Sequence, residues 1–341
     1  MRAGIFEENG GPDVIEIAEV DTPDPGPGEV RIKVGAASMN HLDLWVRRGL
    51  PIETPMPHIG GSDIAGIVDE TGPGVEHVPT GTRVVVDPAL DYEESVGPTR
   101  FAGFGSRHLR LLGEHTQGGF AEYAVVPAEN LVQLPDDVSV EDAAAAGLVG
   151  VTAWRGLLRR GGLQAGERVL VTGASGGVGS MAVQIARLAG AEVYAVTSGA
   201  ESVEKARQLG AHVAYDRLEV DFADQLRSDT GKEGVDLILD SVGEAVWDDC
   251  LKSLKYGGRL VTYGATTGGD ATTKLQRVFW KQLSILGSTM GTPAEYREFM
   301  GVLFRGEVKA VIHQVLPLDA LQRAHEMLEA GEVFGKLVIV P

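Results

Sequence analysis

The spacing of hydrophobic residues changes along the chain and divides it into parts. Up to about residue 135, short apolar runs at residues 30–34, 65–68 and 83–86 alternate with turns rich in glycine and proline, such as residues 23–28. Runs of this length between turn-forming residues are typical of β-strands. The first part of the chain is therefore predicted to be a β-rich, barrel-like domain.

From residue 139 the pattern changes to alternating helices and strands. Ser139 and Asp142 form a helix-start signature before the apolar run at residues 143–158. Alternation of strands with crossover helices predicts a parallel, doubly wound sheet, so the fold class is α/β. Strands are expected at residues 167–172, 192–196, 212–215, 235–239, 259–263 and 283–286, and helices at residues 177–188 and 202–209.

The tail of the chain contains two amphipathic stretches, at residues 293–304 and 318–328, and a final strand at residues 336–340. We expect this tail to return to the first domain. The predicted domains are residues 1–149 together with 291–341, and residues 150–290.

The composition argues against several classes of partner. The formal net charge of −18 disfavours nucleic acids and anionic membranes, because both are negatively charged. The chain lacks an apolar run of membrane-spanning length and a signal-peptide core, so a cytoplasmic protein is expected. Cys250 is the only cysteine, which excludes an internal disulfide and a zinc cluster built from cysteines.

The most informative segment is the glycine-rich turn at residues 169–179, Val-Leu-Val-Thr-Gly-Ala-Ser-Gly-Gly-Val-Gly. It follows a predicted buried strand and opens a predicted helix, where free backbone amides and the helix dipole favour a pyrophosphate. A tight turn without a ligand is the alternative. The residues expected to bind a dinucleotide here are Ala174, Ser175, Gly176, Gly177 and Val178.

The acid that binds the adenosine ribose in NAD-specific sites is missing at the end of the second strand, where the chain has Thr197-Ser198-Gly199. NADP(H) is therefore favoured as the cofactor and NAD(H) is possible. Lys205 could instead be a solvated helix residue and Tyr215 a core aromatic. The expected partners of a 2′-phosphate are Ser198, Ser202, Lys205 and Tyr215.

Several short motifs together resemble the medium-chain dehydrogenase/reductase superfamily, specifically its quinone oxidoreductase-like branch, over nearly the whole chain. The resemblance implies a GroES-like catalytic domain joined to a Rossmann dinucleotide-binding domain. The motifs lie at residues 40–43 (Asn-His-Leu-Asp), 61–66 (Gly-Ser-Asp-Ile-Ala-Gly), 118–123, 174–179, 240–243 and 257–260.

The resemblance also predicts a protein without zinc. Zinc members of the superfamily bind the catalytic metal at positions that here correspond to Asn40, Ser62 and Leu148, none of which is a suitable ligand. Their four-cysteine zinc lobe corresponds to residues 88–119, an irregular stretch without cysteine that is typical of a lobe or lid loop. Its residues Glu114, His108 and His115 are expected to be structural or solvated. Leu42 replaces the hydroxyl residue that relays a proton in the zinc enzymes.

Without zinc, hydride transfer is best suited to an electron-poor acceptor, such as a quinone or an α,β-unsaturated carbonyl compound. The resemblance points to Asn40 as the hydrogen-bond donor to the acceptor oxygen, with Asp43 fixing the loop. Asn40 could instead only cap a turn. Ser62 is expected to line the cleft, or to belong to a loop cap.

The remaining cofactor contacts are expected from the resemblance and from the carboxyl ends of the parallel strands. His41 and Lys336 are assigned to the pyrophosphate, although either could be surface charge. Thr152 is assigned to the nicotinamide amide or to a helix core. Val242, Gly264, Ala265 and Ser288 are assigned to the adenosine and nicotinamide riboses and the nicotinamide.

Three alternative functions remain open. One is an enoyl- or acryloyl-CoA-type reductase, which would need basic residues such as Arg47, Arg48, Arg107 and Arg110 at the cleft mouth. The others are an alcohol dehydrogenase with unconventional metal binding and a dinucleotide-binding protein without turnover. A homodimer or homotetramer that pairs through the sheet edge near residues 259–263 is expected.

Overall fold

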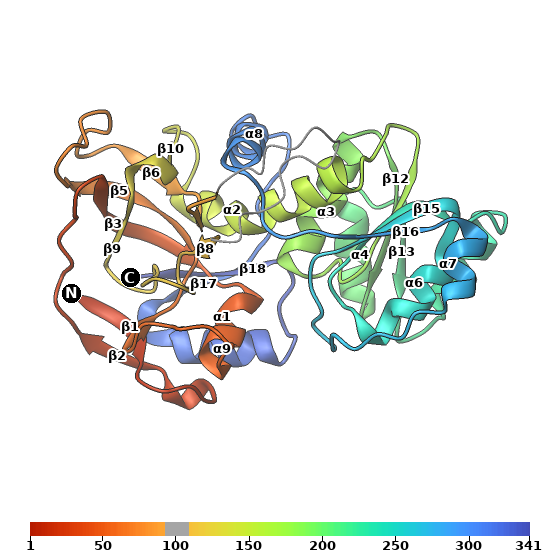
Figure 1. Ribbon diagram of the computed structural model, residues 1–341, viewed down its shortest axis with the longest axis horizontal. Coiled ribbons are helices and arrows are strands. Elements are labelled where there is room, and N and C mark those ends of the chain that lie inside the picture. Colours follow the sequence, from red (N-terminus) through yellow and green to blue (C-terminus); the bar gives the residue numbers. More distant parts are fainter. Residues whose placement is uncertain (93–108) are drawn as a thin grey trace. The chain divides into compact units, whose positions relative to one another are not determined.

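The computed structural model describes residues 1–92 and 109–341. Contacts between residues divide the chain into two compact units (Figure 1). The first unit contains Met1–Leu148 and Gly291–Pro341, and the second contains Val149–Met290. No helix in the described ranges is long and apolar enough to cross a membrane.

The first unit is built on a seven-stranded sheet with the order β10-β6-β5-β3-β18-β17, in which β9 also pairs with β3. A three-stranded sheet, β2-β1-β4, and the pair β7-β8 complete its strands in the described ranges. The strands are β1 (Arg2–Phe6), β2 (Glu16–Glu19), β3 (Glu29–Ser38), β4 (His58–Ile59), β5 (Asp63–Thr71), β6 (Arg83–Val86), β7 (Ala89–Leu90), β8 (Arg110–Leu111), β9 (Tyr123–Pro127), β10 (Leu131–Gln133), β17 (Ile312–Pro317) and β18 (Lys336–Val340).

Alternation along β3 explains how this sheet forms its core. Val30, Ile32 and Val34 are buried, whereas Lys33 between them is exposed. The tail returns as expected, because β18 pairs antiparallel with the end of β3. The helices of this unit are α1 (His41–Arg48), α8 (Pro293–Phe304), α9 (Leu321–Glu329) and the first part of α2 (Val140–Trp154).

The second unit has a six-stranded sheet in which all neighbouring strands are parallel. The order β13-β12-β11-β14-β15-β16 is the strand order 3-2-1-4-5-6 of dinucleotide-binding folds, and it reverses between β11 and β14. The predicted α/β class with a doubly wound sheet is therefore confirmed. The strands are β11 (Arg168–Val171), β12 (Glu192–Thr197), β13 (Val213–Asp216), β14 (Val235–Asp240), β15 (Leu254–Thr262) and β16 (Ser284–Gly287).

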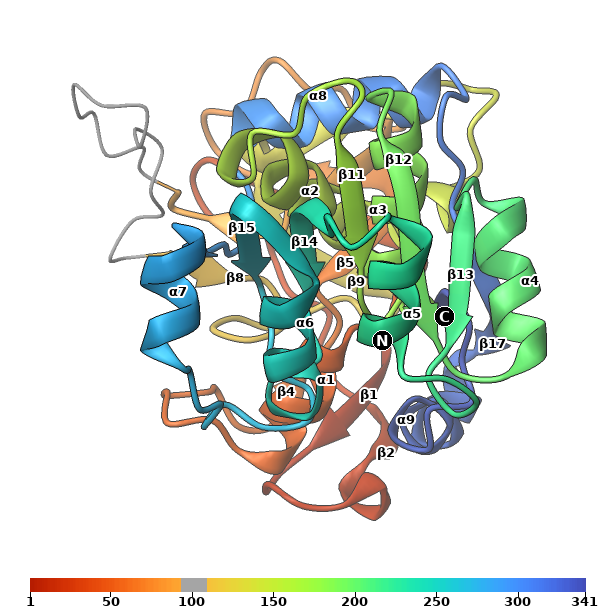
Figure 2. The same cartoon turned by 90° about the vertical axis from the view of Figure 1, so that its right-hand side faces the viewer.

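Helices flank this sheet, with α4 beside β13 and α7 beside β15 at opposite sides of it (Figure 2). Three helices here, α5, α6 and α7, were not expected from the sequence, since each has at most eight residues, too few for a helical period to repeat. The apolar run at residues 143–158 ends as α2 at Trp154 and continues as a π-helical turn, Arg155–Arg160. The helices are α3 (Gly177–Leu188), α4 (Ala200–Gln208), α5 (Phe222–Asp229), α6 (Trp247–Ser253) and α7 (Leu275–Lys281).

Candidate active site

A buried polar cluster lies where three strands of the first unit meet. β3 ends at Ser38, β5 begins at Asp63 and β18 begins at Lys336. Because β3 pairs antiparallel with β5 and with β18, the register brings these side chains together. Asn40 follows β3 as the residue before α1, and 7% of its surface is exposed. Strand pairing thus assembles the cluster from residues up to 296 positions apart.

Both ends of the Asn40 carboxamide are held within the cluster. Its Oδ1 accepts a hydrogen bond from Nζ of Lys336 at 2.5 Å, and its Nδ2 donates to Oδ2 of Asp63 at 2.9 Å. An amide nitrogen carries two hydrogens, so one N–H remains after the bond to Asp63. The result is a neutral donor whose orientation is fixed and whose carbonyl group is polarised by an ammonium group.

The charges of Lys336 and Asp63 balance each other inside the cluster. Nζ of Lys336 lies 3.4 Å from Oδ2 of Asp63, and both side chains are almost fully buried. Asp63 also accepts hydrogen bonds from Oγ of Ser38 at 3.2 Å and from the backbone N–H of Leu148 at 2.7 Å. Burial lowers the pKa of Lys336, and the charges of Asp63 and Asp43 oppose that shift. Lys336, expected at the pyrophosphate, is therefore bonded to side chains of its own unit.

Asp43, in the first turn of α1, holds two loops of the site in place. Its Oδ2 accepts from the backbone N–H of Asn40 at 2.7 Å and its Oδ1 from that of Gly61 at 2.9 Å. Gly61 has a φ of 95°, and a Cβ there would lie 2.9 Å from the backbone nitrogen of Phe120, so the turn requires glycine. Burial raises the pKa of Asp43 to about 6, against the effect of the two backbone hydrogen bonds.

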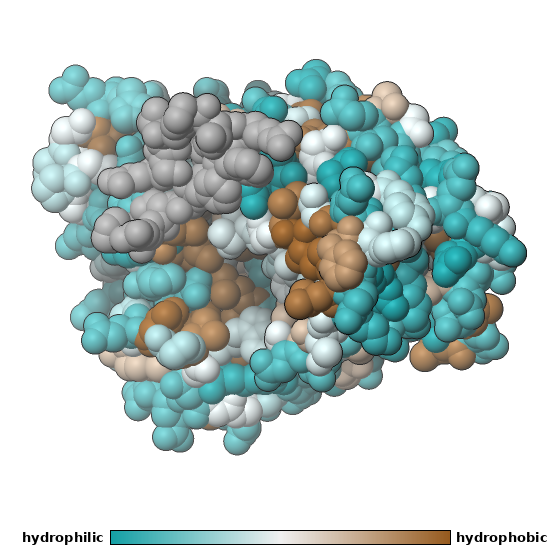
Figure 3. All heavy atoms as spheres, turned by 45° about the vertical axis from the view of Figure 1, so that its right-hand side comes forward, coloured by the Kyte–Doolittle hydropathy of each residue, from teal (hydrophilic) through white to brown (hydrophobic). Residues whose placement is uncertain are grey.

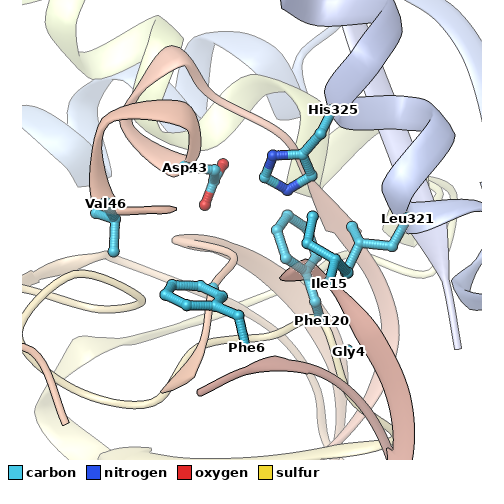
Figure 4. A pocket seen from close by; sticks show the side chains of 9 residues that line it. Gly4, Phe6, Ile15, Asp43, Val46, Phe120, Leu321 and His325 are labelled. Atoms are coloured by element: carbon cyan, nitrogen blue, oxygen red, sulfur yellow. The ribbon is translucent and has the colours of Figure 1, made fainter. Parts of the chain in front are cut away.

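Asp43 and His325 line the same small cavity in the first unit (Figure 4). His325 projects from α9, and its Nδ1 lies 3.3 Å from Nη1 of the buried Arg47. Burial, followed by the charge of Arg47, lowers the pKa of His325 to about 3, so the imidazole is neutral. The rest of the lining is mostly apolar and consists of Gly4, Phe6, Ile15, Val46, Gly60, Phe120 and Leu321.

The positions that correspond to catalytic zinc ligands do not fit a zinc ion. Asn40 offers an amide already bonded to two side chains, Ser62 a hydroxyl and Leu148 an alkyl group, whereas zinc takes thiolate, imidazole or carboxylate ligands. Within residues 1–92 and 109–341, no group of three His, Cys, Asp or Glu side chains could hold a metal ion. His115 accepts from the backbone N–H of Leu111 at 3.1 Å, and His108 lies outside the described residues.

Ser62 differs from its neighbours because its hydroxyl group has no partner. Its side chain is fully buried, and Oγ makes no hydrogen bond to any described residue. A buried hydroxyl without a partner is unfavourable unless a ligand or a water molecule forms a hydrogen bond with it. Ser62 is the second uncharged donor at the positions where zinc enzymes hold their metal.

The glycine-rich turn of the second unit has the geometry of an anion site. It begins after β11, and the bonds from Ala174 N–H to the Val196 carbonyl and from Gly176 N–H to the Gly173 carbonyl, both 3.0 Å, fix its path. A Cβ at Gly179 would lie 2.2 Å from the Gly173 carbonyl oxygen, so only glycine allows this approach.

The amides at the start of α3 are available for a ligand. The N–H groups of its first turn, at Gly177, Val178 and Gly179, have no intrahelical acceptor, and no side chain of the described residues caps this helix. Free amides at the positive end of a helix dipole suit a pyrophosphate. Ala174, Ser175 and Gly176 form the backbone that leads into this turn, so the residues present fit a dinucleotide.

The four residues expected at a 2′-phosphate do not all converge. Ser198 follows β12 and accepts a hydrogen bond at 2.7 Å from Nε of Arg217, a residue that the sequence interpretation missed. Tyr215 points elsewhere, since its hydroxyl donates to Asp229 at 2.9 Å and its ring stacks on Tyr194. Lys205 pairs with Glu201 at 2.6 Å, and Ser202 is half-buried in α4.

Most of the other expected cofactor residues share one edge of the second unit. They follow neighbouring parallel strands: Val242 after β14, Gly264 and Ala265 after β15, and Ser288 after β16. Ser288 donates its backbone N–H to the Thr262 carbonyl at 2.9 Å, while its buried Oγ has no partner in the described part of the chain. Thr152 is buried in α2, and His41 is exposed in the first turn of α1.

Asp240 fixes the loop that follows β14 at this edge. From the sequence it was identified only as part of the motif at residues 240–243. It ends β14, accepts from Oγ1 of Thr172 at 2.6 Å, and accepts from the backbone N–H groups of Val242 and Gly243, both at 3.1 Å. Burial raises its pKa, and these three bonds oppose the shift. Its Asp-Ser-Val-Gly motif was the signal that could have identified it.

Three of the four arginines considered for a CoA substrate lie in the described residues, and each of these forms an ion pair. Arg47 is fully buried and donates to Glu329 and to the Gly10 carbonyl, so it is not available to the phosphates of a CoA substrate. Arg47 is buried because α9 packs against α1. Arg48 also pairs with Glu329, at 2.9 Å, and Arg110 pairs with Asp91 at 2.7 Å. Arg107 lies outside the described residues.

Known proteins match the chain over both units. The family model described as an alcohol dehydrogenase GroES-like domain matches residues 26–136, and that described as a zinc-binding dehydrogenase matches residues 177–305. Quinone oxidoreductase of Rattus norvegicus is 31% identical over 349 residues, covering 100% of this chain and 98% of the relative. Acryloyl-coenzyme A reductase of Metallosphaera sedula is 33% identical over 329 residues, covering 95% and 96%. The crystal structure of an NAD-dependent alcohol dehydrogenase has a TM-score of 0.93 at 38% identity and covers 100% of both chains.

The chain belongs to the medium-chain dehydrogenase/reductase superfamily, as the resemblance in its sequence indicated. It is an oxidoreductase with a GroES-like domain and a Rossmann-type dinucleotide-binding fold.

Proposed function

We propose that this oxidoreductase transfers hydride from NAD(P)H to a quinone or an α,β-unsaturated carbonyl compound without zinc. The observation that carries the proposal is the Asn40 carboxamide, which Lys336 and Asp63 hold in a buried cluster at the position of a metal ligand. The similarity to quinone oxidoreductase of Rattus norvegicus supports the acceptor class.

The chemistry requires a donor for negative charge rather than a metal. The nicotinamide supplies hydride to carbon, and the charge that develops is delocalised onto the acceptor oxygen. The free N–H of Asn40 and the unpartnered hydroxyl of Ser62 would stabilise that oxygen. The ammonium group of Lys336 at Oδ1 makes the amide a stronger donor, and Asp43 keeps the Asn40 loop in place.

The second unit would hold the cofactor through its backbone amides. Gly177 and Val178 would bind the pyrophosphate. The segments at Val242, Gly264 and Ser288 would lie against the nicotinamide half of the cofactor. We propose NADP(H) as the preferred cofactor, with NAD(H) as a weaker one. His41 and Thr152 remain proposed contacts of the pyrophosphate and of the nicotinamide amide.

The test measures oxidation of NADPH and NADH with a panel of quinones, enones and enoyl-CoA thioesters. The reverse reaction is measured as reduction of the oxidised cofactors by simple alcohols. We expect turnover with quinones or enones by protein that contains no stoichiometric zinc. Asn40→Ala should lower kcat/KM by about 10²–10³-fold, the usual effect of removing one oxyanion donor. Asn9→Ala is the control, because among the described residues Asn9 donates to backbone carbonyls at the other end of α1. Tight dinucleotide binding without turnover on any acceptor would refute the proposal.

The second candidate is reduction of an enoyl-CoA. The 33% identity to acryloyl-coenzyme A reductase of Metallosphaera sedula favours it. Of the arginines considered for the CoA phosphates, the exposed Arg48 and Arg110 are each paired with a carboxylate, which weakens the case. A kcat/KM for acryloyl-CoA above that for every quinone and enone would establish this alternative.

We also propose that the protein forms a homodimer through the free edge of β16. Ile285 on this strand is 39% exposed, and on α7 Leu275, Phe279 and Trp280 are 65–71% exposed. Figure 3 shows hydrophobic side chains gathered in patches on an otherwise mostly hydrophilic surface. Ile285→Lys should give monomers in analytical ultracentrifugation. Val315→Lys on β17, the edge of the other large sheet, should leave the assembly intact. A monomeric wild type would rule the dimer out.

A further inference from the structure

His325 on α9 and Asp43 on α1 project into the same small cavity of the first unit (Figure 4). Both residues are only 3% exposed. The other side chains that line the cavity are apolar. Buried polar groups are nearly always hydrogen-bonded, and these walls offer no other side-chain partner. The imidazole and the carboxylate are therefore expected to satisfy each other, directly or through a water molecule.

Arg47 determines which nitrogen of His325 carries the hydrogen. Nη1 of Arg47 lies 3.3 Å from Nδ1 of His325, and a guanidinium group can only donate, so Nδ1 is the acceptor. The imidazole is neutral, because burial and the charge of Arg47 lower its pKa, and its one hydrogen is therefore at Nε2. Within the described ranges, Nε2 has no hydrogen-bond partner. His325 thus brings a free N–H donor to the cavity.

The orientation of this donor is fixed by its neighbours. The imidazole packs edge-on against the ring of Phe120, with centroids 6.4 Å apart and an interplanar angle of 75°. Arg47 is itself held in place, since its Nε donates to the Gly10 carbonyl at 3.1 Å and its Nη2 binds Glu329. Glu329 follows His325 by one turn on α9, so this helix contributes both groups that Arg47 contacts.

The Asp43 carboxylate can accept a further hydrogen bond. Its two oxygens each accept one backbone N–H, from Asn40 at 2.7 Å and from Gly61 at 2.9 Å, whereas a carboxylate has about four lone-pair sites. The cavity is large enough for about one water molecule. A water molecule can accept from Nε2 of His325 and donate to Asp43 at the same time. Donor, acceptor and available volume therefore suit a single bridging water.

We propose that one water molecule binds in this cavity between His325 and Asp43, and that His325 is a positioning residue for Asn40. The inference rests on the proposed role of Asn40 as donor to the acceptor oxygen. Through the water, His325 holds the carboxylate that in turn holds the backbone N–H groups of Asn40 and Gly61. Arg47 follows Asp43 by one turn on α1, so the water closes a ring that anchors the Asn40 loop to α9.

The experiment compares two substitutions of His325 in the full-length protein. The amide of His325→Asn can still accept from Arg47 but is too short to replace Nε2, whereas the amide nitrogen of His325→Gln can take the place of Nε2. His325→Asn should speed hydrogen exchange at the amides of Asn40 and Gly61 about 5–10-fold, the usual effect of one lost hydrogen bond. It should lower kcat with a quinone acceptor by a similar factor. His325→Gln should restore most of both.

The KM for NADPH distinguishes positioning of Asn40 from a general loss of structure. It should stay at the wild-type value in both variants, because the proposed cofactor contacts lie mainly in the second unit. Unchanged exchange at Asn40 and Gly61 in His325→Asn would overturn the inference. Faster exchange with an unchanged kcat would overturn the positioning role.

Val46→Ile tests the water without altering either polar group. It adds one methyl group to the cavity wall, so it should displace the water and reproduce the effects of His325→Asn. Val126→Ile is the matched control, since Val126 on β9 is equally buried in the first unit but does not line this cavity. It should leave exchange at Asn40 and Gly61 unchanged. Equal effects of the two valine variants would contradict the proposal.

A high-resolution crystal structure gives the direct test. It should show one ordered water within hydrogen-bond distance of Nε2 of His325 and of the Asp43 carboxylate. A cavity without water, or direct contact between the two side chains, would refute the site.

Hydrogen exchange and crystallography need no turnover, so they separate this inference from the proposed function. The expected water and exchange rates without turnover on any acceptor would refute hydride transfer and retain the water site. Turnover together with wild-type exchange in His325→Asn and Val46→Ile would do the reverse.

Discussion

The glycine-rich turn of the second unit and the Asn40 cluster of the first unit are built in different ways. The turn is one continuous segment that presents backbone amides, and its glycines allow the close backbone approach. The Asn40 cluster presents side chains, which three strands bring together from distant parts of the sequence. The turn can therefore be recognised from sequence, whereas the cluster becomes visible only through the strand register.

A substitution in the Asn40 cluster should lower the free energy of unfolding more than one in the glycine-rich turn. Lys336→Met removes the ammonium group that balances Asp63, and leaves a buried carboxylate without its counter-charge. We expect the free energy of unfolding to fall by about 3–5 kcal/mol, as for other broken buried ion pairs. Urea unfolding of the variant measures it.

Lys33→Met is the matched control, because Lys33 is exposed on β3, one of the strands that form the cluster. A loss at Lys336 no larger than that at Lys33 would mean that the cluster does not depend on charge balance.

The turn should be sensitive to volume instead of charge. Gly179→Ala adds a Cβ that would lie 2.2 Å from the Gly173 carbonyl oxygen, so the turn must open. We expect a destabilisation of about 1–3 kcal/mol, typical of overpacking, together with weaker dinucleotide binding. A thermal melt and a calorimetric titration measure the two effects.

Gly269→Ala serves as the control in the same unit, since a Cβ there meets nothing within 4 Å. Equal behaviour of the two variants would contradict the close-approach role of Gly179.

Two groups around the cavity of the first unit should give opposite pH dependences. The pKa of Asp43 is raised from 3.8 to about 6, so the native state binds more protons than the unfolded state in this window. Stability due to Asp43 is therefore present below pH 3.8 and falls as the pH rises to 6, by up to about 1.4 kcal/mol per pH unit. Asp43→Asn should remove this fall, measured by urea unfolding between pH 4 and about 7.

His325 should act in the other direction. Its pKa is lowered from 6.5 to about 3, so the unfolded state binds the extra proton between these values. Stability due to His325 is complete above pH 6.5 and is lost as the pH falls towards 3. His325→Gln should make unfolding less sensitive to acid than in the wild type. A variant that becomes more sensitive would contradict burial of a neutral imidazole.

The smallest effect is expected at the surface of α4. Lys205→Gln removes an exposed pair with Glu201 in which the acid precedes the base by four residues. Such a pair stabilises a helix by about 0.3–0.5 kcal/mol and is screened by salt. The difference from wild type in urea unfolding should disappear in about 1 M salt. A larger, salt-independent loss would show that Lys205 has a second, buried role.

Elements with strong local signals could be predicted to the residue. The expected bounds of the helices at 177–188 and 293–304 and of the strand at 336–340 are those of α3, α8 and β18. α8 begins with Pro293 after a capping box formed by Thr292 and Glu295, a signal contained in four consecutive residues. By contrast, α7 has only seven residues, too few for a hydrophobic period to repeat, and it buries none of them.

The candidate site divides in the same way. The sequence pointed to Asn40, Asp43 and Lys336 separately, but the bond between Asn40 and Lys336 depends on how β18 pairs with β3. Arg217 was missed because its approach to Ser198 depends on the pairing of β12 with β13, and no local motif encodes that register.

The pairing of β18 with β3 also bears on how the protein is made. Asp63 and Lys336 are separated by 273 residues, and the whole second unit lies between them in the chain. During synthesis at about 5–20 residues per second, the ribosome delivers Asn40 and Asp63 many seconds before the lysine that holds them. The Rossmann sheet, whose strands are all encoded within that interval, can complete itself while the nascent GroES-like domain still waits for its last strand.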